Sequence, residues 1–401
     1  MPEPRPLTLL CITTYEKGQE FMRECKRAGC RVFLLTAEKL RDADWPRESL
    51  EEIFYLPPEL PLADIVKAVT HLARTQKIDR IVALDEYDME TASTLREHLR
   101  VPGMGLTTMR YFRDKLAMRM RALDRGLRVP DFVPVFHHED IRYYLDHVPG
   151  PWVLKPRQEA SAIGIKKIHV ADELWPILEQ LGEKQSGYLL EKFVPGEVYH
   201  VDSVVSENEI VFANVSKYGK PPMNVAQGGG VFTTFTVPRG SDADAGLRQI
   251  NRDLIAALGL VRGVAHAEFI QAHADGNFYF LECAARVGGA YINEMVEAAT
   301  GINLWREWAR IEIAGGDGTY KLPPTQEEYA GVILSLARQD DPDTSDYNDP
   351  EVFLRIKRHH HAGLILRSSD PQRVPALLES YAQRFVQEFL AVEPPREKPT
   401  A

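Results

Sequence analysis

The sequence predicts an α/β protein of two or three domains that begins with a parallel sheet. Two patterns lead to this fold class: strands and helices alternate over residues 7–112, and a charged strand–turn–strand pattern lies near residue 270. A chain of 401 residues is also too long for one small hydrophobic core.

The alternation in residues 7–112 predicts a parallel sheet, because parallel strands need helical crossovers between them. Ligands of such sheets bind at the loops that follow the C-terminal ends of the strands. The expected elements are strands at residues 7–13, 31–36 and 78–84 and helices at residues 17–28 and 62–75.

A β-hairpin carries the most informative side chains. The turn residues 274–277 separate two apolar strands. Alternation puts His266 and Glu268 on one face, and it puts Phe280 and Glu282 on one face of the partner strand. Two carboxylates facing each other in an apolar hairpin would repel, and a divalent cation such as Mg²⁺ removes that conflict. The alternative is an exposed acidic hairpin followed by a glycine turn.

Four residues that follow Glu282 extend the pattern. Arg286 follows Glu282 by four residues, and Cys283 is expected to pack on the opposite face from Glu282. Gly288 and Gly289 would let a ligand approach the backbone closely.

Lys155 lies in a buried-strand pattern at residues 151–156 and precedes a loop of small residues that runs to Gly164. Such a loop suits a flap over phosphate groups, where backbone N–H groups and an ammonium meet anionic oxygens. The G-x-x-x-x-G-K-[ST] phosphate loop is absent from the sequence. Downstream, Glu191 and Lys192 are by themselves typical of a surface pair.

Taken in order, these segments resemble the ATP-grasp superfamily, and within it the amino-acid ligases that make dipeptides or related amides. Each element alone is unspecific, but five in order at family-like spacing are a strong signal. The resemblance runs from about residue 7 to residue 315, with a weaker continuation beyond. The matching elements are Arg113-Asp114-Lys115, residues 153–156 with the loop to Gly164, residues 191–197, residues 266–269, and residues 281–286 with Gly288-Gly289.

The resemblance implies an ATP-grasp architecture with an N-terminal parallel-sheet (Rossmann-like) domain, a small α+β lid and a C-terminal α+β catalytic domain. The expected divisions are residues 1–112 for the N-terminal domain, 113–190 for the linker helix and lid, 191–318 for the catalytic subdomain, 319–392 for a C-terminal α+β subdomain and 393–401 for a disordered tail.

The resemblance also implies a nucleotide site. Lys115 and Lys155 would contact the phosphates of ATP, and Glu191 would accept a hydrogen bond from the adenine amino group. Glu197 resembles the carboxylate that holds the ribose. The remaining residues assigned to the nucleotide are Ser161 and Gly164 in the lid loop, and Lys192, Phe193 and Val194 along the adenine.

The metal and catalytic roles follow from the same resemblance. Glu268 and Glu282 match the Mg²⁺ ligands, for which Mn²⁺ is an alternative ion. Arg286 matches the arginine that neutralises the transferred phosphate or the bound carboxylate, and His266 would position substrate or phosphate. Many members place Asn two residues after the second glutamate as a further ligand, whereas this sequence has Ala284, which puts a second Mg²⁺ site in doubt.

In the resembling families the N-terminal domain contributes to the pocket of the acceptor substrate. This makes Thr13, Thr14, Asp85 and Glu86 candidates for substrate contact. Helix capping and turn formation are the favoured alternative for these four residues.

Further elements complete the chain. A helix at residues 108–125 would carry Lys115, and the irregular residues 218–230 would cover the acceptor site. The histidines at 359–361 are expected as exposed imidazoles rather than metal ligands. The other expected elements are a helix at residues 292–313, strands at residues 331–337, 352–357 and 362–368, and a helix at residues 371–390.

The composition is that of an ordinary soluble globular protein, with 44% hydrophobic and 26% charged residues. A formal net charge of -10 without a basic patch argues against nucleic acid as an obligate partner. No apolar run approaches the roughly 18 residues of a membrane-spanning helix, and residues 1–6 lack the apolar core of a signal peptide. The four cysteines have no zinc-site spacing and are expected to be reduced thiols of a cytoplasmic protein.

The reaction implied by the resemblance is ATP-dependent ligation through an acyl phosphate. A substrate carboxylate, expected to belong to an amino acid, attacks the γ-phosphorus of ATP, and an amine then displaces phosphate. The expected partners are therefore small-molecule carboxylate and amine substrates, and a homodimer is left open. The alternatives are a kinase-like phosphotransferase on the same scaffold and a non-catalytic nucleotide-binding regulator, against which the presence of Lys155, Glu268 and Glu282 argues.

Overall fold

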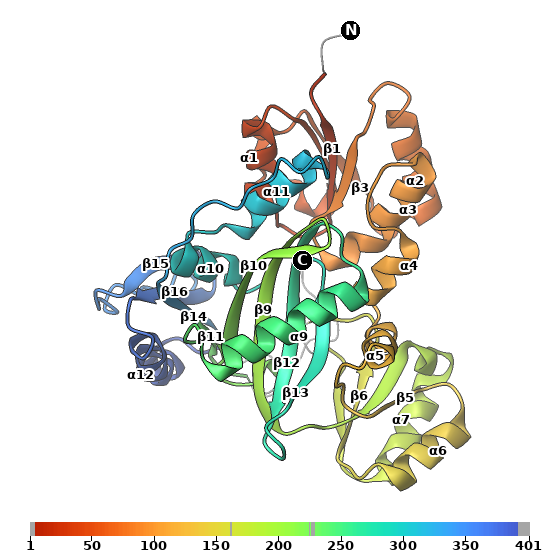
Figure 1. Cartoon of the computed structure of the whole chain (residues 1–401), viewed down its shortest axis with the longest axis vertical. Helices are drawn as coiled ribbons and strands as arrows, with labels where there is room; N and C mark the ends of the chain where they lie inside the picture. Colours follow the sequence, from red (N-terminus) through yellow and green to blue (C-terminus); the bar gives the residue numbers. More distant parts are fainter. Residues whose placement is uncertain (1–4, 161–162, 224, 226–228, 392–401) are drawn as a thin grey trace.

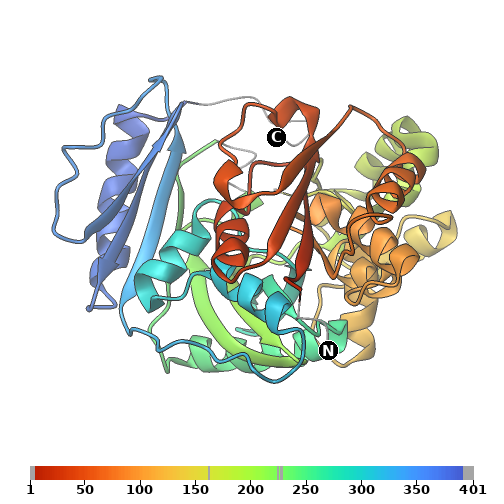
Figure 2. The ribbon, with the colours of Figure 1, turned by 90° about the horizontal axis from the view of Figure 1, so that it is seen from above.

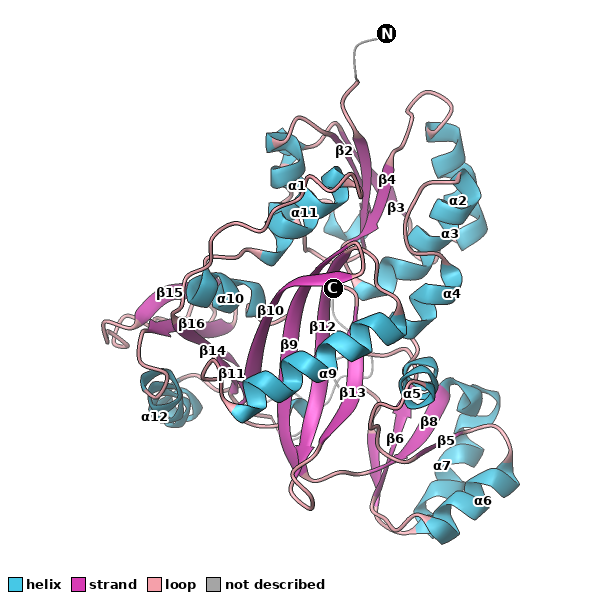
Figure 3. Cartoon of the chain, viewed as in Figure 1, coloured by secondary structure: helices cyan, strands magenta, loops and turns pink. Residues whose placement is uncertain are grey.

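The computed structural model describes residues 5–160, 163–223, 225 and 229–391, and within these residues the named strands form three sheets (Figure 1). Figure 3 shows the helices arranged around the three sheets. Among the described helices, none combines the length and apolar character that a bilayer span requires.

The first sheet is parallel, with strand order β3-β2-β1-β4. Strand β1 is buried along its whole length, which agrees with the apolar run from Leu9 to Ile12 at its centre. Strand β3 and helix α3 add to the elements expected from the sequence. The elements of this part are β1 (Thr8–Thr13), α1 (Gln19–Arg27), β2 (Arg31–Ala37), β3 (Glu52–Leu56), α2 (Leu62–Leu72), β4 (Arg80–Ala83) and α3 (Met89–Leu99).

The second sheet is antiparallel, with strand order β5-β8-β6-β7, and forms a small lid with its own hydrophobic core. The lid lies below helix α5 in Figure 1. Strand β8 ends at Lys192, so the hinge pair Glu191 and Lys192 belongs to the lid sheet. The lid elements are β5 (Phe132–Pro134), α6 (His138–His147), β6 (Trp152–Pro156), β7 (Lys166–Ile168), α7 (Leu174–Leu181) and β8 (Tyr188–Lys192).

The third sheet has the strand order β13-β12-β9-β10-β11-β14-β16-β15, and all its pairs are antiparallel. Its last three strands come from the C-terminal part of the chain, and α12 packs against β14 and β16 (Figure 2). The elements of this part are β9 (Gly196–Ser206), β10 (Glu209–Tyr218), β11 (Phe232–Thr236), α9 (Asp242–Leu258), β12 (Gly263–Ala272), β13 (Phe278–Ala284), α10 (Ile292–Thr300), α11 (Leu304–Ala314), β14 (Tyr329–Leu336), β15 (Val352–Arg358), β16 (His361–Ser368) and α12 (Arg373–Glu388).

Helices cover both faces of the third sheet. Helix α9 shares a core with Val205 and Ala265, whereas α10 and α11 share the opposite core with Val204 and Val264. Both cores also contain side chains of the first sheet, so the N-terminal and catalytic parts are packed together. Helix α11 lies along α1, where Arg306 and Arg310 are paired with acidic side chains of α1.

Two helices expected to be continuous are interrupted. The helix expected at residues 108–125 consists of α4 (Leu106–Met109), a short 3-10 turn and α5 (Lys115–Asp124). Asp114 begins α5, because its side chain accepts hydrogen bonds from the N–H groups of the first helical turn. The helix expected at residues 292–313 is broken at Gly301, whose φ of 76° ends α10.

Candidate active site

The two acidic residues of the hairpin face each other, as alternation predicts. Strands β12 and β13 are antiparallel, and their register pairs Glu268 directly with Glu282. A β-bulge follows this pair, so Leu281 and Glu282 line the same cavity, whereas Phe280 packs with Phe269 in the core of the other face. The expectation that Phe280 shares the face of Glu282 is therefore wrong, because a bulge inserts one residue and shifts the alternation.

Lys115 is the counter-charge of Glu282. Its Nζ atom lies 2.9 Å from Oε2 of Glu282 and donates a hydrogen bond of 2.5 Å to the carbonyl oxygen of Glu159. Burial opposes the ionisation of Glu282, but the ammonium of Lys115 outweighs it and lowers the pKa of Glu282 to about 2. Glu282 is therefore a carboxylate at neutral pH.

Lys155, Glu191 and Arg119 form a buried ion triad on another wall. Lys155 is hydrogen-bonded to Oε1 of Glu191, while Nη2 and Nε of Arg119 lie 3.0 and 3.1 Å from Oε2. Burial lowers the pKa of Lys155 to about 8, although the Glu191 charge works in the other direction. Burial opposes the ionisation of Glu191, but Arg119 and Lys155 together lower the pKa of its carboxyl group.

Arg119 is a site residue that the sequence reasoning missed. It is fully buried, and its Nη1 also donates to the carbonyl oxygen of Leu281 beside the bulge. The available signal is its position four residues after Lys115, which places both cations on one face of α5.

The lid loop after Lys155 reaches the cavity through its apolar side chains. Ile163 and Ile165 line the cavity, and Gly164 lies between them with a φ of +69°. A Cβ atom on Gly164 would lie 2.9 Å from Cγ of Pro156, so this position requires glycine. Ser161, the other residue expected in this loop, lies outside the described residues.

The hinge, residues 191–197, continues the cavity wall that the lid loop begins. The N–H group of Phe193 donates a hydrogen bond of 2.9 Å to the carbonyl oxygen of Pro151. Glu197 is paired with Lys217 at 2.9 Å, which lowers the pKa of the Glu197 carboxyl group. The hinge residues that line the cavity are Lys192, Phe193, Val194 and Glu197.

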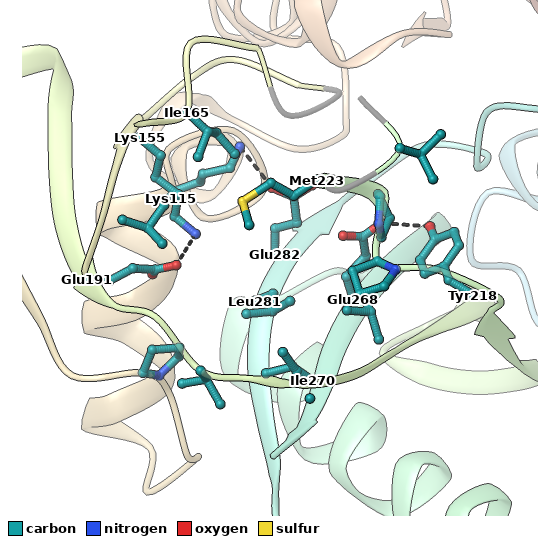
Figure 4. Close-up of a pocket in the computed structure, with 18 of the residues that line it drawn as sticks. Lys115, Lys155, Ile165, Glu191, Tyr218, Met223, Glu268, Ile270, Leu281 and Glu282 are labelled. Carbon is teal, nitrogen blue, oxygen red and sulfur yellow. Dashed lines mark hydrogen bonds and ion pairs between the residues drawn. The ribbon is translucent and has the colours of Figure 1, made fainter. Parts of the chain in front are cut away.

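These walls enclose a cavity of about 690 Å³ between the lid and the third sheet, a volume suited to a nucleotide with part of a second ligand. Figure 4 shows Lys115 paired with Glu282 and Lys155 paired with Glu191 beside it. Met223 and its neighbours Pro221, Pro222 and Val225 also line the cavity. The expected site residues that it brings together are Lys115, Lys155, Glu191, Lys192, Phe193, Val194, Glu197, His266, Glu268, Glu282 and Arg286.

A comparison with protein families identifies the domain to which these residues belong. The ATP-grasp domain family matches residues 148–294, a segment that contains Lys155, the hinge, both facing carboxylates and Arg286. Residues 148–294 are an ATP-grasp domain.

Known proteins resemble the chain beyond this domain. The L-arginine-specific L-amino acid ligase of Bacillus subtilis is 26% identical over 272 residues, which are 66% of this chain and 64% of that protein. The matched segment thus spans less than two thirds of that relative's length.

Solved structures extend the likeness in fold to nearly the whole chain. An L-amino acid ligase from Bacillus licheniformis has a TM-score of 0.77 at 18% identity, covering 97% of this chain and 99% of that chain. The biotin carboxylase domain of the Hydrogenobacter thermophilus 2-oxoglutarate carboxylase, in complex with MgADP, ADP and bicarbonate, has a TM-score of 0.70 at 13% identity, covering 95% and 90%. The protein therefore has the ATP-grasp fold.

His266 of the ATP-grasp domain lies in a buried hydrogen-bond chain. Its Nδ1 is 2.9 Å from Oδ1 of Asp202, and its Nε2 is 3.4 Å from Oε1 of Glu268. Tyr218 donates a hydrogen bond of 2.7 Å to the same Glu268 oxygen, and His200 lies 2.7 Å from Oδ2 of Asp202. Burial would lower the pKa of His266, but the carboxylates of Asp202 and Glu268 outweigh it and raise the pKa to about 9.

Arg286 of the ATP-grasp domain is bound to the N-terminal domain. Its Nε and Nη2 lie 2.8 and 2.5 Å from Oε1 of Glu86, and Arg113 lies 3.2 Å from the other Glu86 oxygen. Burial opposes the charge on Arg286, but Glu86 and Asp85 outweigh it and raise the pKa of the guanidinium. Arg286 thus lines the cavity with its charge already partnered.

The other N-terminal residues considered for substrate contact make interactions within their own domain. Asp85 accepts a hydrogen bond of 3.1 Å from the Tyr87 N–H and pairs with Lys17, so turn formation and ion pairing both engage it. The hydroxyl of Thr13 donates to the Tyr15 carbonyl at 2.6 Å. None of these residues is among those that line the main cavity.

Two glycines after the hairpin have separate surroundings. A Cβ atom on Gly288 would lie 3.0 Å from Nδ1 of His266 and 3.1 Å from Oδ1 of Asp202, so Gly288 makes room for their hydrogen bond. Gly289 lines the cavity, with no atom within 4 Å of the position its Cβ would take. Cys283 is buried in the core on the other face, as expected.

The donor set of the ATP-grasp domain fits a hard divalent cation. Glu268 and Glu282 face each other beside the cavity, and carboxylate oxygens are the ligands that Mg²⁺ prefers. A separate exposed group of metal-ligand types is formed by His359 and His360, at the turn between β15 and β16, and Asp340, in the loop after β14; none of the three lines this cavity.

Proposed function

We propose that the protein is an ATP-dependent carboxylate–amine ligase that couples an amino acid to an amine and releases ADP and phosphate. The observation that carries this proposal is the single cavity in which Lys115 and Lys155 stand beside the facing carboxylates Glu268 and Glu282. The Bacillus subtilis relative is an L-arginine-specific L-amino acid ligase, which supports an amino-acid substrate.

The nucleotide would lie between the hinge and the lid. Glu191 would accept a hydrogen bond from the adenine amino group, because Arg119 and Lys155 keep it ionised and hold it in place. Phe193 and Val194 would line the adenine, and Glu197 would bind the ribose. Lys115 and Lys155 would turn from their present carboxylate partners toward the phosphates, which Ser161 and Gly164 would also contact.

Glu268 and Glu282 would hold Mg²⁺, with Mn²⁺ as an alternative. The cation would neutralise oxygens of the β- and γ-phosphates. Its arrival would replace Lys115 as the counter-charge of Glu282, which frees the ammonium for the phosphates. The MgADP complex of the carboxylase neighbour supports this choice of cofactor.

The acceptor carboxylate would attack the γ-phosphorus of ATP, forming an acyl phosphate and ADP. The carboxylate is ionised at neutral pH and needs no general base. Arg286 would hold this carboxylate or the transferred phosphoryl group through its bidentate guanidinium. The amine would then attack the acyl carbon, forming the C–N bond while phosphate leaves, and the lid would exclude water that hydrolyses the intermediate.

The test is trapping of the intermediate with hydroxylamine. The enzyme is incubated with ATP, Mg²⁺ and single amino acids, and ADP release and hydroxamate formation are measured together. Hydroxamate in equal amount to ADP is expected for the productive amino acid, with the Glu282→Gln variant as the blank. A stable phosphomonoester without hydroxamate would replace the ligase with the kinase-like phosphotransferase.

Once an active acid is found, amino-acid pairs are screened for ADP release and the products are identified by mass spectrometry. A dipeptide or related amide is expected. Release of ADP without a C–N product from any pair would contradict the ligase assignment. The proposal includes a cytoplasmic location, with which the four free and buried cysteines agree.

A further inference from the structure

The pairing of strands β12 and β13 places two positions beside the cation site opposite each other. Position 284, two residues after Glu282, is alanine and offers no side-chain donor atom. The residue directly opposite Ala284 on the neighbouring strand is His266. Directly opposed side chains of an antiparallel pair lie on the same face with Cβ atoms about 5 Å apart.

We propose that Nε2 of His266, on the strand position opposite Ala284, is a third protein ligand of the divalent cation held by Glu268 and Glu282. The proposal rests on the assignment of these two glutamates as cation ligands. It gives His266 direct contact with the cation.

The position of Nε2 suits this role. It lies 3.4 Å from Oε1 of Glu268, and His266 lines the cavity. Two neighbouring ligands of an octahedral ion at about 2.1 Å are separated by about 3 Å. Cation binding would release the Nε2 proton of His266 to solvent, and a small adjustment of the ring would then let Nε2 and the Glu268 oxygen share one cation.

The far side of the ring is arranged as for a metal-binding histidine. Metal-ligating histidines donate their other N–H to a carboxylate or carbonyl, which fixes the ring and the tautomer. Here Nδ1 of His266 is 2.9 Å from Oδ1 of Asp202, whose other oxygen is 2.7 Å from Nδ1 of His200. The two histidines thus hold both oxygens of the Asp202 carboxylate. His200 is itself fixed by the hydroxyl of Thr234, which lies 2.8 Å from its Nε2.

Asp202 itself is not the cation site. The three side chains His200, Asp202 and His266 have ligand-type atoms within 4.8 Å of one another. Both histidines, however, reach Asp202 at hydrogen-bond distances of 2.7 and 2.9 Å, whereas tetrahedral zinc ligands lie roughly 3.4 Å apart. Gly288 has no side chain and so leaves room for the hydrogen bond between His266 and Asp202.

The direct test is pulsed electron paramagnetic resonance on Mn²⁺ bound to the full chain with the β,γ-methylene analogue of ATP. Protein labelled with ¹⁵N-histidine is compared with unlabelled protein. A coordinated imidazole nitrogen is expected to change the electron spin-echo modulation on labelling. Bound Mn²⁺ without a histidine nitrogen signal would overturn the proposal while leaving the glutamate site intact.

The variants test whether positions 266 and 284 exchange roles. His266→Ala is expected to weaken Mn²⁺ binding about 10- to 100-fold, the scale of losses at metal-site partners. The double variant His266→Ala/Ala284→Asn is expected to recover most of that loss, because the asparagine returns a donor from the opposite strand. Ala284→Asn alone and His98→Ala, at an exposed histidine of α3 that does not line the cavity, are the controls.

Unchanged Mn²⁺ affinity in His266→Ala, at an unchanged melting temperature, would contradict the proposal. A folded double variant that binds no better than His266→Ala would contradict the exchange of ligand positions. Failure of the wild-type chain to bind Mn²⁺ with the nucleotide analogue would overturn the glutamate assignment in the proposed function as well.

Discussion

Arg286 and Glu86 are 200 positions apart in the sequence, and their side chains are joined by two hydrogen bonds of 2.8 and 2.5 Å to one carboxylate oxygen. The pair connects the ATP-grasp domain to the turn that follows β4 of the first sheet. It therefore holds an arginine of the proposed reaction centre in a fixed orientation at the boundary between two parts of the molecule.

Replacement of Arg286 by lysine should lower the turnover number more than it raises the Michaelis constant for ATP. A lysine keeps the charge but cannot hold a carboxylate or phosphate through two parallel N–H groups. Steady-state kinetics with the active amino-acid pair measures both constants. Glu86→Gln is the matched comparison, because it weakens the pair while leaving the guanidinium. A larger effect on the Michaelis constant for ATP than on turnover would assign Arg286 to nucleotide binding.

Glu282→Gln should abolish ADP release while leaving the fold intact. A hard cation held by two carboxylates tolerates the loss of one charge poorly. The amide preserves the size of the side chain, so the melting temperature should change little. Glu209→Gln, at an exposed carboxylate at the start of β10, is the control for loss of one negative charge. Near-normal turnover of Glu282→Gln at millimolar Mg²⁺ would contradict the assignment of Glu282 as a metal ligand.

Lys155→Ala should weaken ATP binding strongly and leave adenosine binding almost unchanged. The variant removes a phosphate contact, while Arg119 still holds Oε2 of Glu191 at 3.0 Å for the adenine. Calorimetric titration with ATP and with adenosine separates the two effects. An equal loss of affinity for both ligands would make Lys155 a structural residue.

Arg119→Met should give the opposite pattern, with ATP and adenosine affinity falling by similar factors. Methionine approximates the length of the side chain, but it removes both hydrogen bonds to Glu191 and the one to the Leu281 carbonyl. Loss of one partner of a buried ion pair typically costs about 3 to 5 kcal/mol of stability, so a lower melting temperature is also expected. Selective loss of ATP affinity alone would contradict the assignment of Glu191 to the adenine.

The Asp88→Asn variant should become more stable relative to the wild-type protein as the pH rises. Burial, with a contribution from the Asp85 charge, raises the pKa of Asp88 from an ordinary value of 3.8 to about 7, despite a hydrogen bond from the Thr14 N–H. The folded state therefore keeps a proton that the unfolded chain loses, and the stability from this group falls as pH rises from about 4 through about 7. Asparagine cannot ionise, so the variant escapes this loss.

The free energy of unfolding of both proteins, measured in urea from pH 4 to pH 8, checks this prediction. The difference should be small at pH 4 and grow toward pH 7, with an upper limit of about 4 kcal/mol for a shift of three units. A difference that does not depend on pH would show that Asp88 is ionised in the folded protein.

The sequence by itself determined the features that depend on local periodicity. The alternating strands and helices of residues 7–112 predict the parallel sheet that the structure contains. The two-residue period of a strand was sufficient to predict that Glu268 and Glu282 face each other and that Cys283 points into the core. These features follow from the geometry of neighbouring residues, which the sequence states directly.

Tertiary structure alone decided the partners of the charged side chains. Arg119 meets Glu191 across 72 positions and Arg286 meets Glu86 across 200, because packing of the lid and the two larger parts brings them together. Even within the hairpin, the bulge at Leu281, just before Glu282, moved Leu281 to the cavity and Phe280 to the core. A bulge and a long-range ion pair both depend on how whole elements pack, and no period of 2 or 3.6 residues encodes that packing.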